Sequence, residues 1–178
     1  MAKLSVLQIM ERRGGGLGAG TYAGVLCLVL MALAGSVALL LRSPWLFPSL
    51  GPTVMLFFES PKVPAARPLN TLVGHGVGLA AGALCLYTLG LDRIPSAPLG
   101  GLTPLHLVSG AVSVALTTFV LSWLKLPHPP AGATTLIVSL GILGTPAALA
   151  SMAGAVILVT AVGWGLNILL GTRPAGAA

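Results

Sequence analysis

The chain has 178 residues, of which 56% are hydrophobic and only 7% are charged, and its mean hydropathy is +1.00. This composition excludes an ordinary soluble domain and predicts an integral membrane protein surrounded by the lipid bilayer. Nine basic and three acidic residues give a net charge of +6. The basic residues are scattered singly apart from Arg12-Arg13, so the dense basic face of a nucleic-acid-binding protein is not expected.

Residues 1–20 form an N-terminal segment that we expect to lie in the cytoplasm. It carries three basic residues and a glycine run, and it lacks the pattern of a cleavable signal peptide. Residues 4–10 are a candidate for a short interfacial helix. The apolar run that follows, Tyr22–Leu41, has 20 residues and is long enough to cross a bilayer.

Five more apolar runs follow, and their lengths are unequal. Leu69–Leu89, Thr103–Leu124 and Ala147–Leu170 each suit a full membrane helix, whereas Trp45–Phe58 and Ala131–Leu143 are short. At about 1.5 Å per residue, a helix of about 13 residues covers only about 20 Å of a hydrocarbon core of about 30 Å. Neither short run crosses the bilayer as a helix alone.

Each short run is associated with a proline-rich stretch, Ser43–Pro52 or Leu126–Pro130. In His128-Pro-Pro, the prolines fix φ and push the residue before them into an extended conformation, so we expect extended chain from Leu126 and a helix from Pro130. An extended stretch and a half-helix together can cross the bilayer. Such backbone is tolerated at depth only inside the protein or along a wet cavity.

The same order of elements occurs twice, over residues 22–90 and 103–170. Gly51-x-Thr53 in the first copy matches Gly132-x-Thr134 in the second. The predicted fold is therefore an all-α membrane protein with two repeats of long helix, proline-broken short half-helix and long helix. We expect one transmembrane domain over residues 21–171, followed by a C-terminal tail over 172–178.

Two membrane topologies fit this order. Six crossings make the repeats inverted, a common transporter plan, whereas four crossings with two re-entrant segments make them parallel. With six crossings and a cytoplasmic N-terminus, seven of the nine basic residues lie inside: Lys3, Arg12, Arg13, Lys62, Arg67, Lys125 and Arg173. The other two, Arg42 and Arg93, lie outside. Four crossings give a split of five to four, so the positive-inside rule favours six.

In the six-crossing arrangement the N-termini of the short helices point toward each other near the midplane. Each N-terminus carries free backbone N–H groups and about half a positive charge, which favours an anion. The candidate ligands that line this point are two glycines that allow close approach and four hydroxyl donors: Gly51, Gly132, Ser49, Thr53, Thr134 and Thr135. The alternative is that these hydroxyls bond only to helix backbone.

The three histidines are the clearest ionisable groups in the apolar runs. His75 follows Asn70 within a stripe of glycines, so we expect it to face the bundle interior, where it either complements an anion, carries a proton or bonds another helix. His128 is a ligand or a support for the extended segment, and His106 is structural. We count Asn70 among the ligands and expect no metal site and no cofactor, because no Cys, Asp or Glu accompanies the histidines.

Three stretches resemble signatures of the HPP family of integral membrane proteins. Pro127-His-Pro-Pro-Ala-Gly-Ala-Thr134 is similar to the octet of that family, Arg67–His75 to its second signature and Ser49-Leu-Gly51 to its third. The resemblance covers residues 20–170. It implies four membrane helices and, for some members in cyanobacteria and chloroplasts, nitrite transport. Pro52-Thr53 stands where the family leads us to expect Ala and Ser, which leaves the choice of ligand open.

These observations predict a transporter or channel for a small monovalent anion, with nitrite as the candidate that the resemblance suggests. The alternatives are a structural or sensory membrane module and an intramembrane enzyme, and the enzyme is disfavoured because no carboxylate accompanies the histidines. We expect a bacterial inner-membrane protein that forms a homodimer through small-residue helix faces. The candidate contacts are Gly78, Gly82, Gly154, Gly163 and Gly165.

Overall fold

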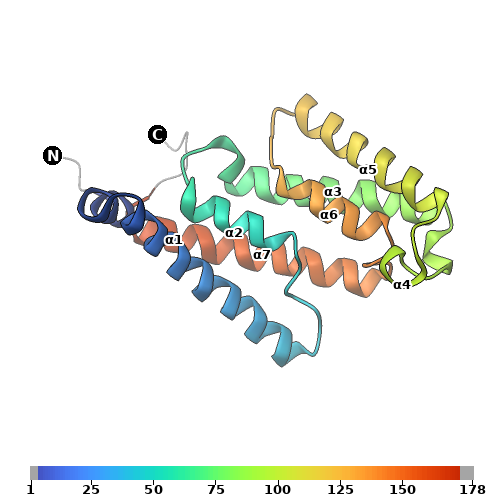
Figure 1. Ribbon diagram of the computed structural model, residues 1–178, viewed down its shortest axis with the longest axis horizontal. Helices are drawn as coiled ribbons and strands as arrows, with labels where there is room; N and C mark the ends of the chain where they lie inside the picture. The colour runs from blue at the N-terminus through green and yellow to red at the C-terminus, as the bar shows by residue number, and fades with distance from the viewer. Residues whose placement is uncertain (1–3, 173–178) are drawn as a thin grey trace.

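The computed structural model describes residues 4–172, and all regular structure in that range is helical (Figure 1). Lys3, Arg173 and the rest of the predicted tail lie outside it. The seven α-helices are α1 (Val6–Leu41), α2 (Leu50–Glu59), α3 (Pro68–Thr88), α4 (Ala97–Gly100), α5 (Pro104–Trp123), α6 (Pro130–Ser139) and α7 (Pro146–Leu169). Two 3-10 turns, η1 (Pro64–Ala66) and η2 (Leu91–Arg93), complete the order. The all-α prediction is confirmed.

Four helices are long and apolar enough to cross a membrane: α1, α3, α5 and α7. Three of them begin at a proline in the first turn, where the missing N–H group costs nothing and the fixed φ suits a helix. Thr103 and Thr145 cap α5 and α7 by accepting hydrogen bonds from first-turn N–H groups. The predicted runs for α3, α5 and α7 match these helices to within one residue at each end.

Helix α1 is longer than the predicted run Tyr22–Leu41. Ser5 and Gln8 form a capping box at its start, and Gly15 breaks it with φ 55° and ψ −137°, a conformation that glycine adopts most easily. The predicted interfacial helix is thus the first arm of α1. The backbone N–H of Val6 donates to the carbonyl oxygen of Leu170 at 3.0 Å, which ties this arm to the end of α7.

The two short helices run in opposite directions from the middle of the molecule. Helix α2 leads to the end where α3 begins, α6 leads to the end where α7 begins, and α3 and α7 run antiparallel (Figure 1). Each short helix has 10 residues, or about 15 Å. The predicted short runs overestimate the lengths of α2 and α6. Residues 44–47 have no regular structure, and Gly141, at φ 80°, lies in the turn after α6.

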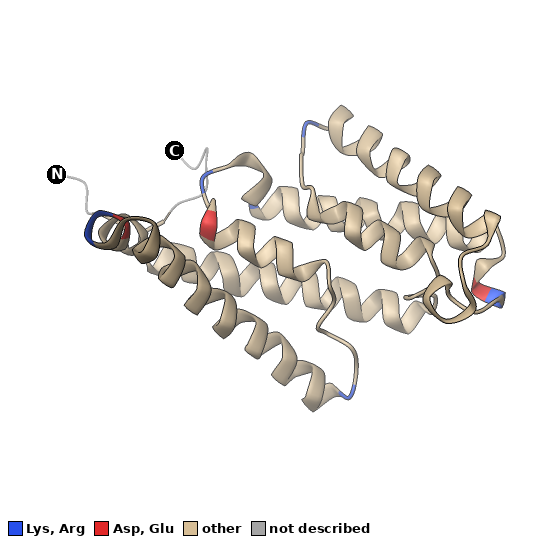
Figure 2. Cartoon of the chain, viewed as in Figure 1, with Lys and Arg blue, Asp and Glu red and all other residues tan. Residues whose placement is uncertain are grey.

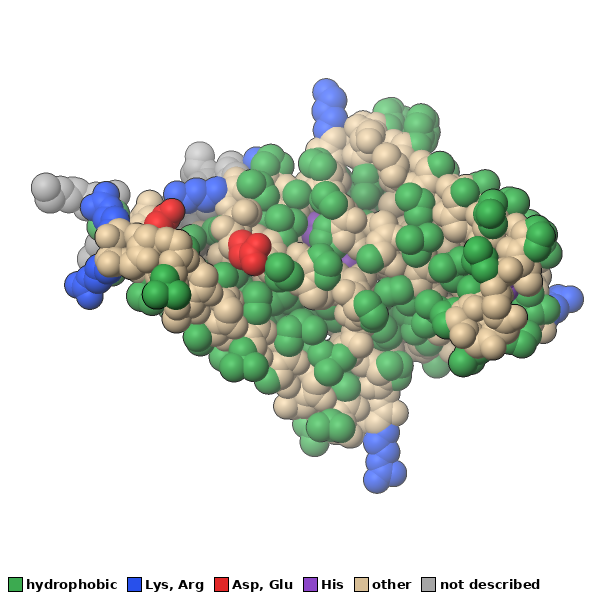
Figure 3. Space-filling view, in the orientation of Figure 1, with side chains coloured by type: hydrophobic (Ala, Val, Ile, Leu, Met, Phe, Trp, Pro, Cys, Tyr) green, Lys and Arg blue, Asp and Glu red, His purple; other side chains and the backbone are tan. Residues whose placement is uncertain are grey.

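Within residues 4–172, charged residues lie in the first arm of α1, in the loops and at helix ends, and the body of the bundle is uncharged (Figure 2). Hydrophobic side chains cover the face that Figure 3 shows, and leucines such as Leu39 and Leu169 are 82% exposed. In water so much exposed apolar surface would be unfavourable, whereas in a bilayer it is the expected lipid-facing surface. The protein is an integral membrane protein.

Most glycines proposed for a dimer contact are used inside the chain. A Cβ atom at Gly78 or Gly82 would lie 2.8 Å from a carbonyl oxygen of α6. One at Gly163 would meet Phe57 at 2.7 Å, and one at Gly154 would meet Trp45 at 2.8 Å. These glycines allow helices of one chain to approach closely. A Cβ at Gly165 meets nothing within 4 Å, and the homodimer itself stays a prediction.

Candidate functional site

The imidazole of His75 lies between two threonines that come from the two short helices. Its Nε2 atom is 2.9 Å from Oγ1 of Thr53, and its Nδ1 atom is 2.6 Å from Oγ1 of Thr134. All three side chains are at most 1% exposed. The first turns of α2 and α6 therefore meet at the second turn of α3, in the interior of the bundle.

His128 completes this group, which we call the histidine–threonine cluster (Thr53, His75, His128 and Thr134). Its Nε2 atom is 3.2 Å from Nε2 of His75, and the two rings meet edge to face with centroids 4.9 Å apart. The carbonyl oxygen of Ala65 lies 2.8 Å from Nδ1 of His128. Because a carbonyl oxygen only accepts, His128 carries a hydrogen on Nδ1, and Nε2 of the neutral ring is an acceptor.

The remaining hydrogens of the cluster follow from their partners. Thr53 Oγ1 donates its single hydrogen to the carbonyl oxygen of Ser49 at 3.1 Å, so it accepts from Nε2–H of His75. Nδ1 of the neutral His75 ring then has no hydrogen and accepts from Oγ1–H of Thr134. The same Nε2–H group of His75 is also directed at the free Nε2 atom of His128.

Close backbone packing holds His128 against α3. A Cβ atom at Gly74 would lie 2.7 Å from Cβ of His128, so only glycine leaves room there. One turn earlier, Nδ2 of Asn70 donates to the carbonyl oxygen of Pro127 at 3.0 Å. Asn70 therefore positions the segment that carries His128. Its hydrogen bond also satisfies the carbonyl group of Pro127, which no regular secondary structure pairs.

The N-termini of α2 and α6 lack side-chain caps, unlike those of α1, α5 and α7. Ser49 stands at the N-cap position of α2, is fully buried, and its hydroxyl has no hydrogen-bond partner. Nothing lies within 4 Å of a Cβ built at Gly51 or Gly132. A hollow of about 340 Å³ separates the two N-termini and is lined by Pro52, Leu56, Pro129, Pro130 and Ala133.

Thr135 lies outside the cluster. Its Oγ1 atom donates to the carbonyl oxygen of Ala131 at 2.9 Å and accepts from Oγ1 of Thr117 at 2.9 Å, so it joins α6 to α5. Ser109 on α5 also donates to the carbonyl oxygen of Ser139 at 2.8 Å. The sequence analysis missed this polar face of α5, although hydroxyl residues at positions 109, 113 and 117 recur at the four-residue spacing of one helix face.

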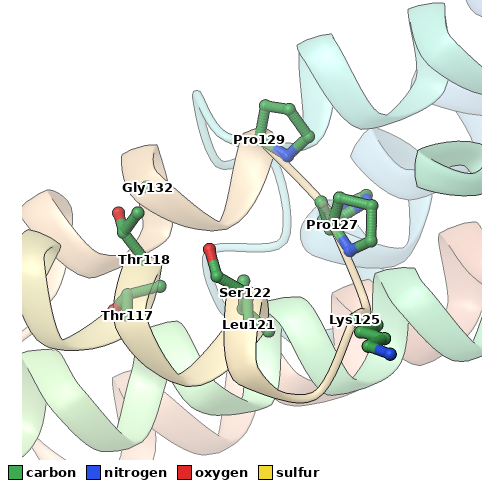
Figure 4. Close-up of a pocket in the computed structure, with 9 residues that line it drawn as sticks. Thr117, Thr118, Leu121, Ser122, Lys125, Pro127, Pro129 and Gly132 are labelled. Atoms are coloured by element: carbon green, nitrogen blue, oxygen red, sulfur yellow. The ribbon is translucent and has the colours of Figure 1, made fainter.

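Each histidine of the cluster also lines a cavity. A cavity of about 410 Å³ lies between the end of α5 and the His-Pro-Pro segment (Figure 4). Its lining includes Thr117, Thr118, Ser122, Lys125, His128 and Gly132. A second cavity of about 300 Å³ lies between α3 and α7, against His75 and Gly76. His106 is remote from both, and its Nδ1 atom lies 2.9 Å from Oγ1 of Thr103 in the capping box of α5.

Comparison with known proteins now identifies the family. The family model described as HPP, transmembrane region, matches residues 16–175. The chain belongs to the HPP family. A transmembrane protein of Dictyostelium discoideum is 28% identical over 117 residues, which cover 66% of this chain and 34% of that protein. The match thus spans about a third of the relative's length. No solved structure matches the chain.

The three stretches that resemble HPP signatures converge in space. The octet supplies His128 and Thr134, the second stretch supplies Asn70, Gly74 and His75, and the third ends at the first turn of α2. Residues far apart in the sequence thus meet at one buried polar cluster of a largely apolar bundle. Because burying so many polar groups costs free energy unless each is paired, their concentration marks this HPP site as the candidate functional centre.

Proposed function

We propose that this HPP protein transports a small monovalent anion across the membrane, and that nitrite is the first candidate. The observation that supports the proposal best is the meeting of two uncapped half-helix N-termini at the buried histidine–threonine cluster. Each N-terminus carries about half a positive charge from the dipole of its helix, and a hollow lies against the first turns of both helices. Two such partial charges match one negative charge.

The surroundings favour weak and reversible binding. No Lys or Arg occurs within α2, α3, α6 or α7, so an anion at this depth meets dipoles and hydroxyl groups but no fixed cation. A permanent cation would hold the anion too tightly for release, and conduction requires sites that the ion can leave. The hollow of about 340 Å³ holds a small anion with several waters, since each water takes about 30 Å³.

The hydroxyl of Ser49, at the N-cap position of α2, is an unused donor. It is buried without a partner, which costs free energy unless a ligand or water accepts its hydrogen. Gly51 and Gly132, without side chains, leave the first turns of α2 and α6 accessible to a ligand. In this proposal the anion accepts from Ser49, and it recruits Thr134 when that hydroxyl is released from His75.

We further propose that the chain crosses the membrane six times, as two inverted repeats. The opposite directions of α2 and α6 support this arrangement, because each short helix runs from the level of His75 to a different end of the bundle (Figure 1). Each repeat then contains one broken crossing. This is the plan in which half-helix N-termini form a transport site at the midplane.

Anion flux into proteoliposomes tests the function. The purified protein is reconstituted, and uptake of nitrite, nitrate, chloride and formate is measured down an anion gradient at equal pH on both sides. We expect saturable uptake of at least one monovalent anion and no uptake of sulfate. If every anion enters at the rate of protein-free liposomes, the protein is not an anion transporter, and a structural or sensory role takes its place.

Threonine variants test the site itself. Thr134→Val should weaken anion affinity by about 10- to 150-fold, because a hydrogen bond to an ion contributes about 1.5–3 kcal/mol. Thr53→Val should also weaken it, because it removes the acceptor that orients Nε2–H of His75. The two effects should not add, since both threonines act through His75. Thr160→Val is the matched control, because the Thr160 hydroxyl is buried without a partner. Normal flux in both test variants would place the site elsewhere.

A further inference from the structure

The hydrogen-bond pattern of the cluster leaves one place for an added proton. In the neutral state Nδ1 of His75 has a lone pair that accepts from Thr134, while Nε2–H of His75 points at Thr53 and at the free Nε2 atom of His128. A proton on Nδ1 keeps every contact satisfied. The resulting imidazolium donates from Nε2 to two acceptors and from Nδ1 to Oγ1 of Thr134.

This change reverses the role of Thr134. While His75 is neutral, Oγ1–H of Thr134 is used as a donor to Nδ1, at 2.6 Å. Once Nδ1 carries a hydrogen, the Thr134 oxygen becomes the acceptor and its own hydrogen is free to turn toward an anion. In the step itself, an O–H bond of a hydronium ion breaks, a new N–H bond forms at Nδ1, and water leaves.

Only one proton fits. The Nε2 atoms of His75 and His128 are 3.2 Å apart, which suits one hydrogen between them. A second proton on Nε2 of His128 would bring two N–H donors head to head and place two positive charges together in a buried site. His128 therefore stays neutral and stabilises the imidazolium of His75 by accepting from it.

No fixed charge competes for this proton. Helices α3, α6 and α7 contain no Asp, Glu, Lys or Arg, and the charged residue of α2 is the exposed Glu59 at its far end. Arg67 precedes α3 and Lys125 follows α5. Lys125 lines the same cavity as His128, but neither cation bonds to a cluster histidine among the hydrogen bonds of residues 4–172. The other titratable groups on α3 and α5 are Cys85, Tyr87 and His106. Cys85 and Tyr87 lie two or more turns from the cluster along α3, and His106 lies in the capping box of α5. The charge of an anion beside His75 is thus the available partner for an imidazolium.

We propose that His75 binds one proton together with each anion, so that the protein is an electroneutral proton–anion cotransporter in which protonation of Nδ1 releases the Thr134 hydroxyl to the anion. This inference rests on the proposed anion transport. It adds the second substrate, a proton, and assigns its binding atom. The cavities beside His75 and His128, of about 300 and 410 Å³, are large enough for the water that brings and removes the proton.

Accumulation against a gradient tests the coupling. Proteoliposomes with equal nitrate on both sides receive an inside-alkaline gradient of about one pH unit, at a membrane potential clamped to zero. One proton per anion predicts about tenfold accumulation of nitrate, because one pH unit equals a tenfold concentration ratio. A clamped change in membrane potential should not alter that ratio. The same assay with nitrite is compared with protein-free liposomes, which report the passage of nitrous acid through lipid.

Histidine variants assign the proton. His75→Gln should lose the accumulation of nitrate driven by the pH gradient, from about tenfold to none, and any downhill flux that remains should no longer depend on pH. His106→Gln is the matched control and should retain the tenfold accumulation, because glutamine at the third position of α5 preserves the capping box with Thr103. Downhill flux that ignores the pH gradient in the unmodified protein overturns proton coupling and leaves anion transport standing. Absence of any flux overturns both.

Nitrogen NMR of the imidazole rings provides a readout without transport. The chain has three histidines, so ¹⁵N-histidine labelling gives three ring systems that the His75→Gln and His106→Gln variants assign. We expect hydrogen on Nε2 of His75 and on Nδ1 of His128 without anion. Saturating nitrate at fixed pH should convert His75 to the imidazolium while His128 stays neutral, since binding of anion and proton is linked. A His75 ring that stays neutral with nitrate, or a proton on His128 in its place, overturns the proposal.

Discussion

His75 is the residue at which the two halves of the chain meet. Thr53 and Thr134, which occupy equivalent positions of the predicted repeat, contact opposite nitrogens of one ring. The ring has no counterpart, because the position 81 residues later is Val156, and the residue that corresponds to His128 is the buried Phe47. Two half-helices from corresponding parts of the predicted repeat thus enclose two histidines that have no counterparts in the other repeat. This asymmetry suits the proposed site for a single anion.

Two glycines beside His75 provide a prediction at the residue scale. Gly74→Ala should lower the free energy of unfolding by about 1–3 kcal/mol, because the added methyl group overlaps His128. Gly76→Ala, two positions along the same helix, should be neutral or stabilising by up to about 1 kcal/mol, since its Cβ meets nothing within 4 Å and alanine favours a helix. Thermal unfolding of the two variants in one detergent measures the difference. Equal midpoints would mean that His128 is not packed against position 74.

At the scale of elements, the short helices depend on polar contacts as much as on apolar packing. Helix α6 is tied to α5 through Thr117 and Thr135 and to α3 through Thr134 and His75. In a bilayer the apolar surfaces of helices gain little by leaving lipid, so hydrogen bonds and close glycine packing contribute a larger share of association. A half-helix of 10 residues needs such contacts, because it is too short to be held by the bilayer alone.

A double-mutant cycle tests the contact between α5 and α6. Thr117→Val and Thr135→Val should each cost about 1 kcal/mol of unfolding free energy, and the double variant should cost less than their sum. Thr21→Val, combined with Thr117→Val, is the control and should be additive, because Thr21 bonds to its own helix at the carbonyl oxygen of Leu17. Additivity in the Thr117–Thr135 pair would show that the hydroxyls do not join these helices.

At the scale of the whole molecule, the proposed topology determines which loops face the cytoplasm. Six crossings place positions 62 and 125 inside and position 93 outside. Single cysteines at these positions, in a background with Cys27→Ala and Cys85→Ala, are treated in intact cells with an impermeant thiol reagent. Position 93 should react, and positions 62 and 125 should react only after the cells are opened. Labelling at 62 but not at 93 would support four crossings with two re-entrant segments.

The sequence by itself determined the membrane environment and the ends of the long helices α3, α5 and α7, whereas it missed the start of α1 and overestimated the lengths of α2 and α6. Pro68, Pro104, Pro130 and Pro146 each mark a helix start, because proline acts on the backbone within one turn and needs no distant partner. It also singled out Thr53, His75, His128 and Thr134, because polar residues are conspicuous in an apolar chain. The break at Gly15 was not predicted, since a glycine run permits a kink without requiring one.

Only the tertiary structure decided which of these residues touch. The contacts of His75 join residues 22, 53 and 59 positions away, and no local pattern specifies partners across such separations. The structure also placed Thr135 against Thr117, outside the cluster, and assigned Gly78, Gly82, Gly154 and Gly163 to packing within the chain. The physical reason is that the direction in which a side chain points from a buried helix depends on how the neighbouring helices pack. In an apolar chain almost every helix face is hydrophobic, so the sequence pattern does not indicate which face is buried.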